Sequence, residues 1–456
     1  MPGYVEDTIA ALATPPGTGA VAVLRVSGRD ACAVASRILR RRSGRLPPPL
    51  ESHRARLAIL VDPVSGDAID EVLVLPMLAP RSFTGEDVVE IQCHGGVLIA
   101  DRVLRALLAS GARAARPGEF TERAFLNGRL DLCQAEAVAD LIEASSDAGR
   151  MAAWQQLEGA LSRAVREVHD RIVDVRALVE AHLDFPEDDL PAEAEDEIAS
   201  GLDAVRADLE RLAATFSRGR LAREGIRVVL LGKPNVGKSS LLNAILGRER
   251  ALVSEQPGTT RDYLEEPAAI GNLRLLLFDT AGVRPGAGAV ERAGIERTLE
   301  VVTVADVVVV VLDRSRPLDE EDAAVLGAAG EQARVVVRNK SDLPEAWPSE
   351  PGMIDVSART GAGIEELSAA LERAMPSPHS ESAAEPVVVT RARHHEAILG
   401  CAAGVDRARS ALLSRDVLEI VACELQSAAV ELERLLGGTD VDELLDRIFR
   451  RFCIGK

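Results

Sequence analysis

Hydrophobic positions follow a strand-like rhythm over the first 120 residues of the chain. Short apolar runs that alternate with polar positions and are bounded by turn residues are typical of strands. Strands are predicted over residues 20–26, 68–75 and 87–92. Helices are predicted over residues 31–41 and from Gly95-Gly96 to about residue 109. Residues 1–120 are therefore predicted to form one compact α/β unit.

From about residue 121, apolar positions recur every three or four residues, and Ala, Leu, Glu and Arg dominate. This spacing places the apolar side chains on one face of a helix. Helices are predicted over residues 132–144, 148–183 and 192–216, with a proline-containing acidic break before the third. The helical pattern returns over residues 391–452 and is interrupted at Gly437-Gly438. Both stretches indicate an all-helical domain.

Between these stretches, apolar runs alternate with helical patterns. The runs lie at residues 226–231, 273–278, 306–312, 334–338 and 353–356. Such alternation predicts a mostly parallel sheet that helices cover on both faces. The simplest organisation is a helical domain, residues 121–218 and 379–456, interrupted by an inserted α/β domain, residues 219–378. The predicted fold class is α/β plus all-α.

The inserted domain carries a glycine loop directly after its first predicted strand. The segment Gly232-Lys233-Pro234-Asn235-Val236-Gly237-Lys238-Ser239 fits the pattern G-x-x-x-x-G-K-[ST] without a mismatch. Strand, glycine loop and helix together are the setting of a phosphate-binding loop, whose backbone N–H groups surround phosphate oxygens. Lys238 is expected to reach the β- and γ-phosphates, and Ser239 to offer its hydroxyl to Mg²⁺.

Three further motifs follow in order at strand ends, and they favour guanine. Asp279-Thr280-Ala281-Gly282 offers a carboxylate that can hold Mg²⁺ through water and an N–H for the γ-phosphate. In Asn339-Lys340-Ser341-Asp342, the last carboxylate can accept two hydrogen bonds from the guanine edge, which adenine lacks. Ser357-Ala358-Arg359 offers a backbone N–H to the guanine carbonyl. Thr259-Thr260 suits a Mg²⁺-binding switch threonine. The predicted ligand is GTP rather than ATP.

The group that orients the attacking water is less obvious. Gly282 is followed by Val283, which cannot act as the glutamine of Ras-type enzymes does. Glu291 is a candidate for this role. An ordinary surface glutamate at a helix start explains Glu291 at least as well.

The composition limits the binding partners and the cellular compartment to be expected for this protein. A formal net charge of −19 argues against broad, non-specific nucleic-acid binding. One basic cluster, Arg40, Arg41, Arg42 and Arg45, is best explained as a solvated loop or helix end. The six cysteines form no C-x-x-C pair, which is typical of free thiols in a reducing cytosol. No apolar run approaches ~20 residues and no signal peptide is recognisable, so a cytoplasmic protein without membrane contact is expected.

Several motifs outside the nucleotide segment are specific. They are Ala13-Thr14-Pro15-Pro16-Gly17, Phe83-Thr84-Gly85-Glu86-Asp87-Val88-Val89-Glu90, Arg116-Pro117-Gly118-Glu119-Phe120-Thr121-Glu122-Arg123-Ala124-Phe125-Leu126-Asn127 and Phe452-Cys453-Ile454-Gly455-Lys456. With the GTPase motifs they span the whole chain, which thereby resembles the MnmE (TrmE) family of tRNA modification GTPases. The resemblance implies a Ras-like inserted G domain and a GTP-hydrolysing enzyme. Such enzymes add a carboxymethylaminomethyl or aminomethyl group to carbon 5 of the wobble uridine in certain tRNAs.

The resemblance also implies partners and a one-carbon cofactor. The partners are MnmG, an FAD-carrying and NADH-using subunit, in a heterotetramer, together with tRNA and a second copy of this chain. The N-terminal domain is implied to mediate dimerisation and to bind 5,10-methylenetetrahydrofolate, with 5-formyltetrahydrofolate as an analogue. By motif position the folate contacts are Arg25, Glu90, Arg129 and Lys456. Strand alternation alone favours solvent-facing positions for Arg25 and Glu90. The resemblance reverses that interpretation, because a carboxylate can pair with the amino-pyrimidine edge of a pterin.

In the G domain, the resemblance implies a dimer across the nucleotide with K⁺ bound there. The ion neutralises charge on the transferring phosphate, as an arginine finger does elsewhere. The implied K⁺ ligands are Asn235, Ser254, Gln256 and Thr259, and the Mg²⁺ ligands are Ser239 and Thr260. Glu291 matches the water-orienting glutamate. The whole set of expected GTP contacts is Asn235, Val236, Gly237, Lys238, Ser239, Ser240, Ser254, Glu255, Gln256, Pro257, Gly258, Thr259, Thr260, Asp279, Thr280, Ala281, Gly282, Asn339, Lys340, Asp342, Ser357, Ala358 and Arg359.

The C-terminal tail adds one candidate catalytic residue, Cys453. The resemblance places this tail near the folate, and a nearby cation such as Lys456 lowers a thiol pKa. A buried, purely packing cysteine is an equally good interpretation. Two other functions also stay open. One is a GTP-switched ribosome-assembly factor without covalent chemistry, and the other is a free-standing folate aminomethyltransferase with a regulatory G domain.

Overall fold

The computed structural model describes residues 7–41, 50–183, 192–249, 265–270, 273–279, 305–328, 333–374, 387–414, 418–438, 442–450 and 452–456. The chain divides into two compact units. The first comprises Met1–Ala139, Leu157–Ile198 and Arg407–Lys456, and the second comprises Asp140–Gln156 and Ala199–Asp406. Each unit is described by itself.

Among the described residues, the first unit contains a seven-stranded sheet in the order β3-β4-β5-β6-β2-β1-β7. Its strands are β1 (Ile9–Leu12), β2 (Val21–Ser27), β3 (Leu39–Arg40), β4 (Arg56–Val61), β5 (Ala68–Met77), β6 (Val88–His94) and β7 (Arg113–Ala114). Neighbouring strands are antiparallel, except for the parallel pair β1 and β7. This mixture of strands and helices confirms the predicted α/β class of the N-terminal part.

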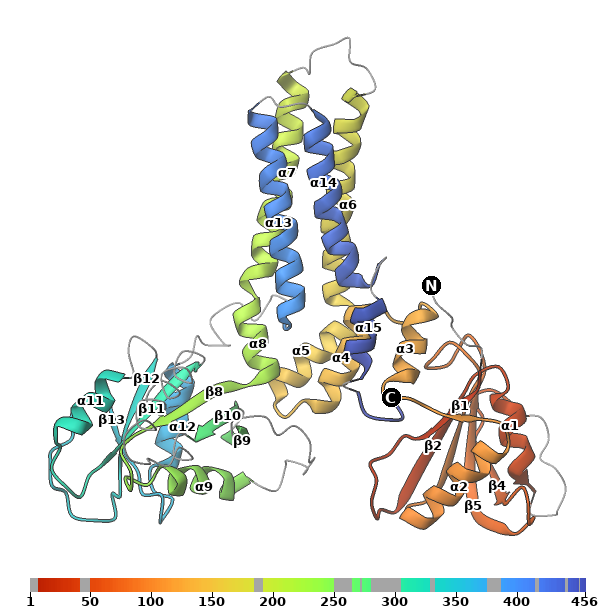
Figure 1. The fold of residues 1–456 in the computed structure, drawn as a ribbon, viewed down its shortest axis with the longest axis horizontal. Coiled ribbons are helices and arrows are strands. Elements are labelled where there is room, and N and C mark those ends of the chain that lie inside the picture. Colours follow the sequence, from red (N-terminus) through yellow and green to blue (C-terminus); the bar gives the residue numbers. More distant parts are fainter. Residues whose placement is uncertain are drawn as a thin grey trace, which may run out of the picture. The chain divides into compact units, whose positions relative to one another are not determined.

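One face of this sheet is covered by helices α1 (Ala31–Ile38) and α2 (Val97–Ala109), as Figure 1 shows. Leu24 of β2 and Ile91 of β6 lie in the core beneath these helices. Because side chains alternate along a strand, the neighbouring Arg25 and Glu90 point to the opposite face. They are paired across β2 and β6 in the strand register.

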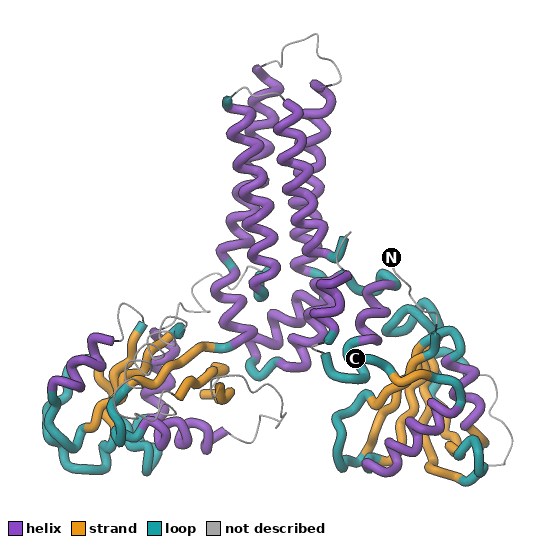
Figure 2. The backbone as a smooth tube through the Cα atoms, in the orientation of Figure 1, coloured by secondary structure: helices purple, strands orange, loops and turns teal. Residues whose placement is uncertain are grey.

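The helical part of the first unit joins segments that are distant in sequence. Helix α6 (Ala160–Leu183) packs on α14 (Leu418–Leu436), and Figure 2 shows both as long helical tubes. The buried side chains of α6 recur at helical spacing and are Leu161, Val165, Val168, Ile172, Val175 and Val179, together with Ser162. Each fully buried aliphatic side chain of this kind stabilises the fold by ~1.5–3 kcal/mol. The predicted helical class is confirmed.

The last residues of the chain are anchored beside α3 (Glu119–Leu126) and α4 (Leu132–Glu143). Phe449, at the end of α15 (Asp442–Phe449), and Phe452 share an apolar cluster with Leu132 of α4. Gly118, just before α3, has φ +71°, and a Cβ there would lie 2.6 Å from the carbonyl oxygen of Phe449. The close backbone approach therefore requires glycine at this position.

In the second unit, helices lead directly into a parallel sheet. The helices that lie wholly or mainly here are α5 (Asp147–Leu157), α7 (Ala192–Ala214), α8 (Phe216–Glu224) and α13 (Ala392–Leu413). Helix α8 is followed at once by β8, and Arg220 of α8 pairs with Asp306 at 2.5 Å. The other Asp306 oxygen accepts the Arg227 N–H of β8 at 2.9 Å. These contacts tie the start of the sheet to the preceding helix.

Among the described residues, this second sheet has the order β13-β12-β11-β8-β10-β9. Its strands are β8 (Ile226–Leu231), β9 (Glu265–Ile270), β10 (Leu273–Asp279), β11 (Val307–Asp313), β12 (Arg334–Asn339) and β13 (Met353–Asp355), and its helices include α9 (Lys238–Glu249), α11 (Glu320–Ala328) and α12 (Ile364–Ala374). Only β9 is antiparallel to its neighbour. Every residue of β11 is buried, as expected for a strand covered on both faces. The predicted mostly parallel sheet is confirmed.

Four local predictions were wrong or incomplete. The helix predicted over 31–41 ends at Ile38, because Leu39 and Arg40 pair with β4 as a strand. The single helix predicted over 148–183 is two helices, interrupted near Gly159, which has φ +80°. The helix predicted over 192–216 ends at Ala214, and a separate helix, α8, begins at Phe216. Strands β1 and β4 were not predicted. The domain boundaries at 120, 218 and 378 remain predictions.

Two expectations about the surface can be compared with the described residues. Of the basic cluster, Arg40 lies in β3 and Arg41 follows it, whereas Arg42 and Arg45 lie outside the described residues. No helix in the described ranges is both long and apolar enough to cross a membrane.

Candidate functional site

The phosphate loop connects β8 to α9, and its backbone is shaped by two residues with positive φ. Asn235 has φ 65° and Gly237 has φ +97°. A Cβ on Gly237 would lie 2.3 Å from Nδ2 of Asn339, so only glycine fits there. Helix α9 begins at Lys238 and contains Ser239 and Ser240 in its exposed first turn. The loop thus presents a helix N-terminus, as anion binding requires.

Two lysines hold this loop in shape. Lys238 donates from Nζ to the carbonyl oxygens of Gly232 at 2.6 Å and Lys233 at 3.0 Å. Lys233, which is nearly fully buried, pairs with Asp319 at 2.5 Å and Asp322 at 2.8 Å. The contacts of Lys233 were not predicted, because its position in the loop pattern admits any residue. They anchor the phosphate loop to the start of α11.

The predicted guanine motifs meet the phosphate loop through Asn339. Its Nδ2 donates to the carbonyl oxygen of Val236 at 2.8 Å, and its Oδ1 accepts the Ala358 N–H at 3.1 Å. One amide thereby joins the phosphate loop to the segment 357–359. Because the amide nitrogen must donate and the oxygen must accept, an aspartate could not make both bonds.

The carboxylate of Asp342 is held on both sides by the segment 357–359. Ser357 donates from Oγ to Oδ1 of Asp342 at 2.6 Å, and Arg359 pairs with Oδ2 at 2.6 Å. The hydrogen bond from Ser357, followed by the charge of Arg359, holds the pKa of Asp342 below its usual range. The neighbouring Lys340 has φ 66° and donates to Asp313 at 2.6 Å. The structure therefore brings together the predicted residues of these two segments except Lys340, whose side chain pairs with Asp313 of β11.

The remaining predicted GTP and ion contacts cannot be compared with the structure. Asp279 ends β10 in register with Leu230 of β8, and only its backbone is described. The following predicted residues lie outside the described residues: Ser254, Glu255, Gln256, Pro257, Gly258, Thr259, Thr260, Thr280, Ala281, Gly282 and Glu291. Their roles remain predictions.

A second cluster lies on the open face of the first sheet. Arg25 donates from Nε and Nη2 to Oε1 of Glu90 at 3.0 and 2.7 Å. Their side chains are only 14% and 18% exposed. The guanidinium of Arg25 lies over the rings of Phe83 and Phe120, 5.3 and 5.7 Å from their centroids. Strand alternation correctly predicts that Arg25 and Glu90 lie on the face opposite the helices. The rings of Phe83 and Phe120 nevertheless shield the ion pair from bulk water.

The C-terminal tail reaches the same cluster. The Gly455 carbonyl oxygen accepts from Nη1 of Arg25 at 3.5 Å, and the Lys456 carbonyl oxygen accepts the Phe120 N–H at 3.2 Å. Burial, reinforced by the charge of Arg25, lowers the pKa of Lys456, while Glu90 acts in the opposite direction. Three of the four predicted folate contacts thus lie together.

The other predicted residues of this site have different surroundings. Cys453 is exposed, so its interpretation as a buried packing residue was wrong. Arg129 is also exposed, and a Cβ on Gly85 would lie 3.2 Å from its Cγ. This places Arg129 beside the loop that carries Phe83. The aromatic covers, Phe83 and Phe120, were missed as functional candidates, although both occur in the motifs that carried the family resemblance.

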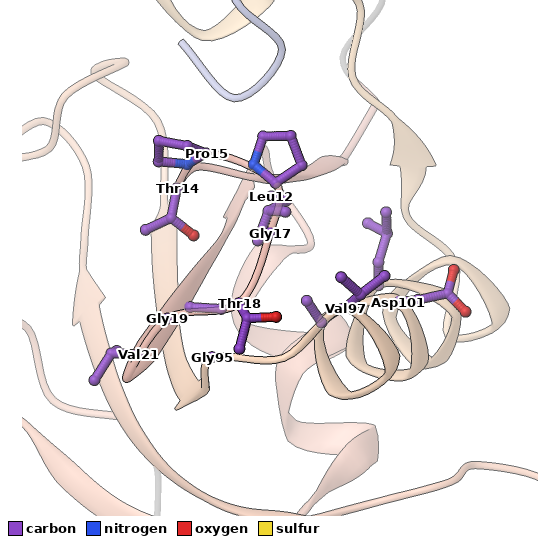
Figure 3. A pocket seen from close by; sticks show the side chains of 14 residues that line it. Leu12, Thr14, Pro15, Gly17, Thr18, Gly19, Val21, Gly95, Val97 and Asp101 are labelled. Atoms are coloured by element: carbon purple, nitrogen blue, oxygen red, sulfur yellow. The ribbon is translucent and has the colours of Figure 1, made fainter. Parts of the chain in front are cut away.

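The first unit also contains a cavity of about 500 Å³, and its lining residues differ from those of the Arg25–Glu90 cluster (Figure 3). Its lining includes the loop from Thr14 to Gly19 and the first turns of α2, with Val97 and Asp101. A Cβ on Gly95 would lie 2.4 Å from the Gly19 carbonyl oxygen, so the loop and the α2 entry are closely packed. None of the predicted folate contacts lines the cavity.

Comparison with known proteins shows which family this chain resembles. Two family models match, the "GTP-binding protein TrmE N-terminus" over residues 8–129 and the "MnmE helical domain" over residues 132–453. Curated proteins named "tRNA modification GTPase MnmE" from Geobacter sulfurreducens, Geotalea uraniireducens and Moorella thermoacetica are 45%, 44% and 42% identical. Each match covers 99% of this chain and 100% of the relative.

Among solved structures, Aquifex aeolicus Era bound to GDP·AlF4⁻ matches 41% of this chain and 67% of its own. The identity is 23% and the TM-score is 0.27, a likeness too distant to carry an argument. The curated relatives, by contrast, align with 99% of this chain, and the helical-domain model spans its phosphate loop. The chain therefore belongs to the MnmE family.

Proposed function

We propose that this protein is a GTP-hydrolysing tRNA modification enzyme of the cytoplasm. With MnmG, in a heterotetramer, it adds a carboxymethylaminomethyl or aminomethyl group to carbon 5 of the wobble uridine. The names of its relatives support the tRNA modification and the GTPase activity. The observation that best supports the proposal is the contact of the C-terminal tail with the Arg25–Glu90 pair. Gly455 of the tail bonds to Arg25, although the two residues are 430 positions apart in sequence.

The nucleotide half of the proposal rests on the residues around the phosphate loop. The loop N–H groups and Lys238 bind the phosphates, and Lys238 exchanges its two carbonyl partners for phosphate oxygens. Asp342 accepts the N1–H and 2-amino hydrogens of guanine, and in doing so replaces its contact with Arg359. Ser239 and Thr260 hold Mg²⁺, and Asp279 supports it through water.

For hydrolysis, a second copy of the chain supplies the facing G domain. Asn235, Ser254, Gln256 and Thr259 hold K⁺, which neutralises charge that develops on the transferring phosphate. The exposed position and positive φ of Asn235 support this role, because its side chain stands clear of the loop core. Glu291 orients the attacking water, and the remaining GTP contacts act as the family resemblance implies.

The folate half of the proposal rests on the donor and acceptor set of the cluster. Arg25 uses only Oε1 of Glu90, so Oε2 remains able to accept from an amino-pyrimidine edge. Lys456 and Arg129 supply positive charge for an anionic ligand. This residue set fits 5,10-methylenetetrahydrofolate, which supplies a one-carbon unit when bound. The chain's own residues bind and orient it, and Phe83 and Phe120 exclude water from the ion pair.

Reconstitution tests the proposal. Full-length protein is combined with MnmG, tRNA, GTP, and tetrahydrofolate carrying an isotopically labelled one-carbon unit. The expected result is label in the wobble uridine, and loss of label when GTP or MnmG is omitted. GTP hydrolysis without transfer of label under any condition would favour the ribosome-assembly alternative. Transfer without MnmG would favour a free-standing aminomethyltransferase.

A further inference from the structure

An arginine of the G domain is buried directly after three consecutive valines of a strand. Arg338 is the penultimate residue of β12, and only 1% of it is exposed. Val336, two residues before it and on the same face of the strand, packs together with Trp347 against an apolar cluster. An arginine is costly to bury unless all its N–H groups are bonded. A buried Arg338 therefore requires hydrogen-bond acceptors for all its guanidinium N–H groups.

All five N–H donors of Arg338 have acceptors. Nε donates to Asp355 Oδ1 at 2.6 Å, and Nη2 donates to Asp355 Oδ2 at 3.0 Å. Both terminal nitrogens donate to Oε1 of Glu345 at 3.1 Å, and Nη1 also donates to the Trp347 carbonyl oxygen at 2.9 Å. The Trp347 ring lies 4.8 Å from the guanidinium carbon. A planar fork with five donors is required for this pattern, and lysine cannot reproduce it.

These partners belong to the two segments that surround the guanine motifs. Arg338 immediately precedes the segment 339–342, and Glu345 and Trp347 follow that segment within five residues. Asp355 ends β13, two residues before Ser357. A single guanidinium thus fastens the chain before and after Asp342 and just before its partner Ser357.

A second arginine, Arg314, comes directly after β11 and also binds the segment that carries Asp342. Arg314 donates from Nη1 to the Ser341 carbonyl oxygen at 3.0 Å and from Nη2 to Glu345 Oε2 at 3.2 Å. Glu345 therefore lies between two arginines, and the hydrogen bond from Arg338, followed by that from Arg314, holds the pKa of Glu345 below its usual range. The loop that carries Asp342 is held by side chains at both of its ends.

We propose that Arg338 is a positioning residue for guanine specificity, acting through Asp342 and Ser357 without touching the nucleotide. Guanine offers Asp342 two roughly parallel N–H groups at a fixed spacing, so the carboxylate must stand at one angle to accept both. The fork of Arg338 fixes that angle by holding both segments at once. This inference rests on the guanine-binding role of Asp342 proposed above.

Comparing GTP with inosine triphosphate tests the inference. Inosine retains the N1–H and the carbonyl of guanine but lacks the 2-amino group, so it loses one of the two bonds to Asp342. The intact protein should bind GTP about ten- to a hundredfold more tightly than inosine triphosphate. In Arg338→Lys, this ratio should fall to within about threefold of one, because Asp342 no longer holds both bonds. Binding is measured by fluorescence titration of the full chain, with no tRNA, folate or MnmG present.

Two milder variants guard against misfolding. Glu345→Gln and Asp355→Asn keep the shape of each partner and remove its charge, so each should lower the ratio part of the way. Arg220→Lys, which weakens the pair with Asp306 outside the guanine segments, is the matched control and should leave the ratio unchanged. In an Asp342→Ala background, Arg338→Lys should have no further effect on the ratio.

The outcomes distinguish the positioning role of Arg338 from the guanine-binding role of Asp342 on which it rests. An equal loss of affinity for both nucleotides in Arg338→Lys, or an unchanged ratio in all three variants, would show that Arg338 only stabilises the fold. A ratio near one in the intact protein would instead overturn the guanine role of Asp342, and the positioning role with it. Failure of tRNA modification would change neither measurement.

Discussion

Gly455→Ala tests whether the close approach of the C-terminal tail positions Lys456. Gly455 has φ +95°, and an added Cβ would lie 2.3 Å from the Leu12 carbonyl oxygen. Even a tight contact needs 3.0 Å, so one backbone must retreat by at least 3.0 − 2.3 = 0.7 Å. Leu12 is paired with Leu24 inside the sheet, and the next residue, Ala13, donates to Val23 at 2.7 Å. The tail, rather than the sheet, is therefore expected to move.

The forces that hold the tail are small enough for one methyl group to matter. The Phe120 N–H reaches the Lys456 carbonyl at 3.2 Å, and the Gly118 N–H reaches the Cys453 carbonyl at 3.5 Å. With the 3.5 Å bond from Arg25 to the Gly455 carbonyl, three such bonds hold the tail, at ~0.5–1.5 kcal/mol each or roughly 1.5–4.5 kcal/mol together. The left-handed conformation costs alanine about 1–2 kcal/mol, before the clash is counted. The substitution thus removes most of the preference for the seated tail.

The assay is calorimetric titration with 5-formyltetrahydrofolate. A charge-assisted bond from Lys456 is worth ~1.5–3 kcal/mol, so Gly455→Ala should weaken binding by about ten- to a hundredfold. GTP hydrolysis should be unchanged, because the G domain is untouched. Gly66→Ala is the matched control: Gly66 has φ +78° in the same domain, but no atom lies within 4 Å of its added Cβ. It incurs the backbone strain without the clash and should bind the folate normally.

Two results would refute this reasoning. Native affinity in Gly455→Ala would mean that the tail does not position a folate contact. A double variant, Gly455→Ala with Lys456→Met, that binds much more weakly than Lys456→Met alone would mean that the damage does not act through Lys456.

Four further predictions follow from the sites. Asp342→Asn should weaken GTP binding by more than about tenfold and favour xanthosine triphosphate, and unchanged GTP affinity would contradict the guanine assignment. GTP hydrolysis should be much faster in K⁺ than in Na⁺ at matched ionic strength, and equal rates would exclude a K⁺-dependent mechanism. Cys453→Ser should retain GTP hydrolysis and lose most tRNA modification, whereas full modification would show that the thiol is dispensable. Hydrogen bonds from Arg113 and Arg123 hold the pKa of Asp7 below its usual 3.8, so this stabilisation is present above pH 3.8 and is lost as the pH falls through the folded-state pKa. Asp7→Asn should therefore lower the free energy of unfolding at neutral pH, with a difference that shrinks in acid, and a difference independent of pH would contradict the pairing.

The nucleotide site could be predicted in detail because its residues are close in sequence to the strands that carry them. In a parallel sheet the carboxyl ends of strands meet at one edge, so motifs after β8 and β12 must converge. The contact of Asn339 with Val236 is the result. The switch residues and Glu291 remain predictions because they lie outside the described residues.

Residue patterns alone determined the fold class, the phosphate loop and the family resemblance, because periodicity and motif spacing are local properties of the chain. Tertiary structure alone decided that Arg25 pairs with Glu90 beneath two aromatic rings and the C-terminal tail. It also decided that Arg338, which follows three valines in its strand, makes five hydrogen bonds to four acceptor oxygens. A strand pattern reports which side chains share a face, but not which distant segment covers that face. That choice depends on how the folded chain brings together residues hundreds of positions apart, and it is made by packing and by the need to satisfy buried charge.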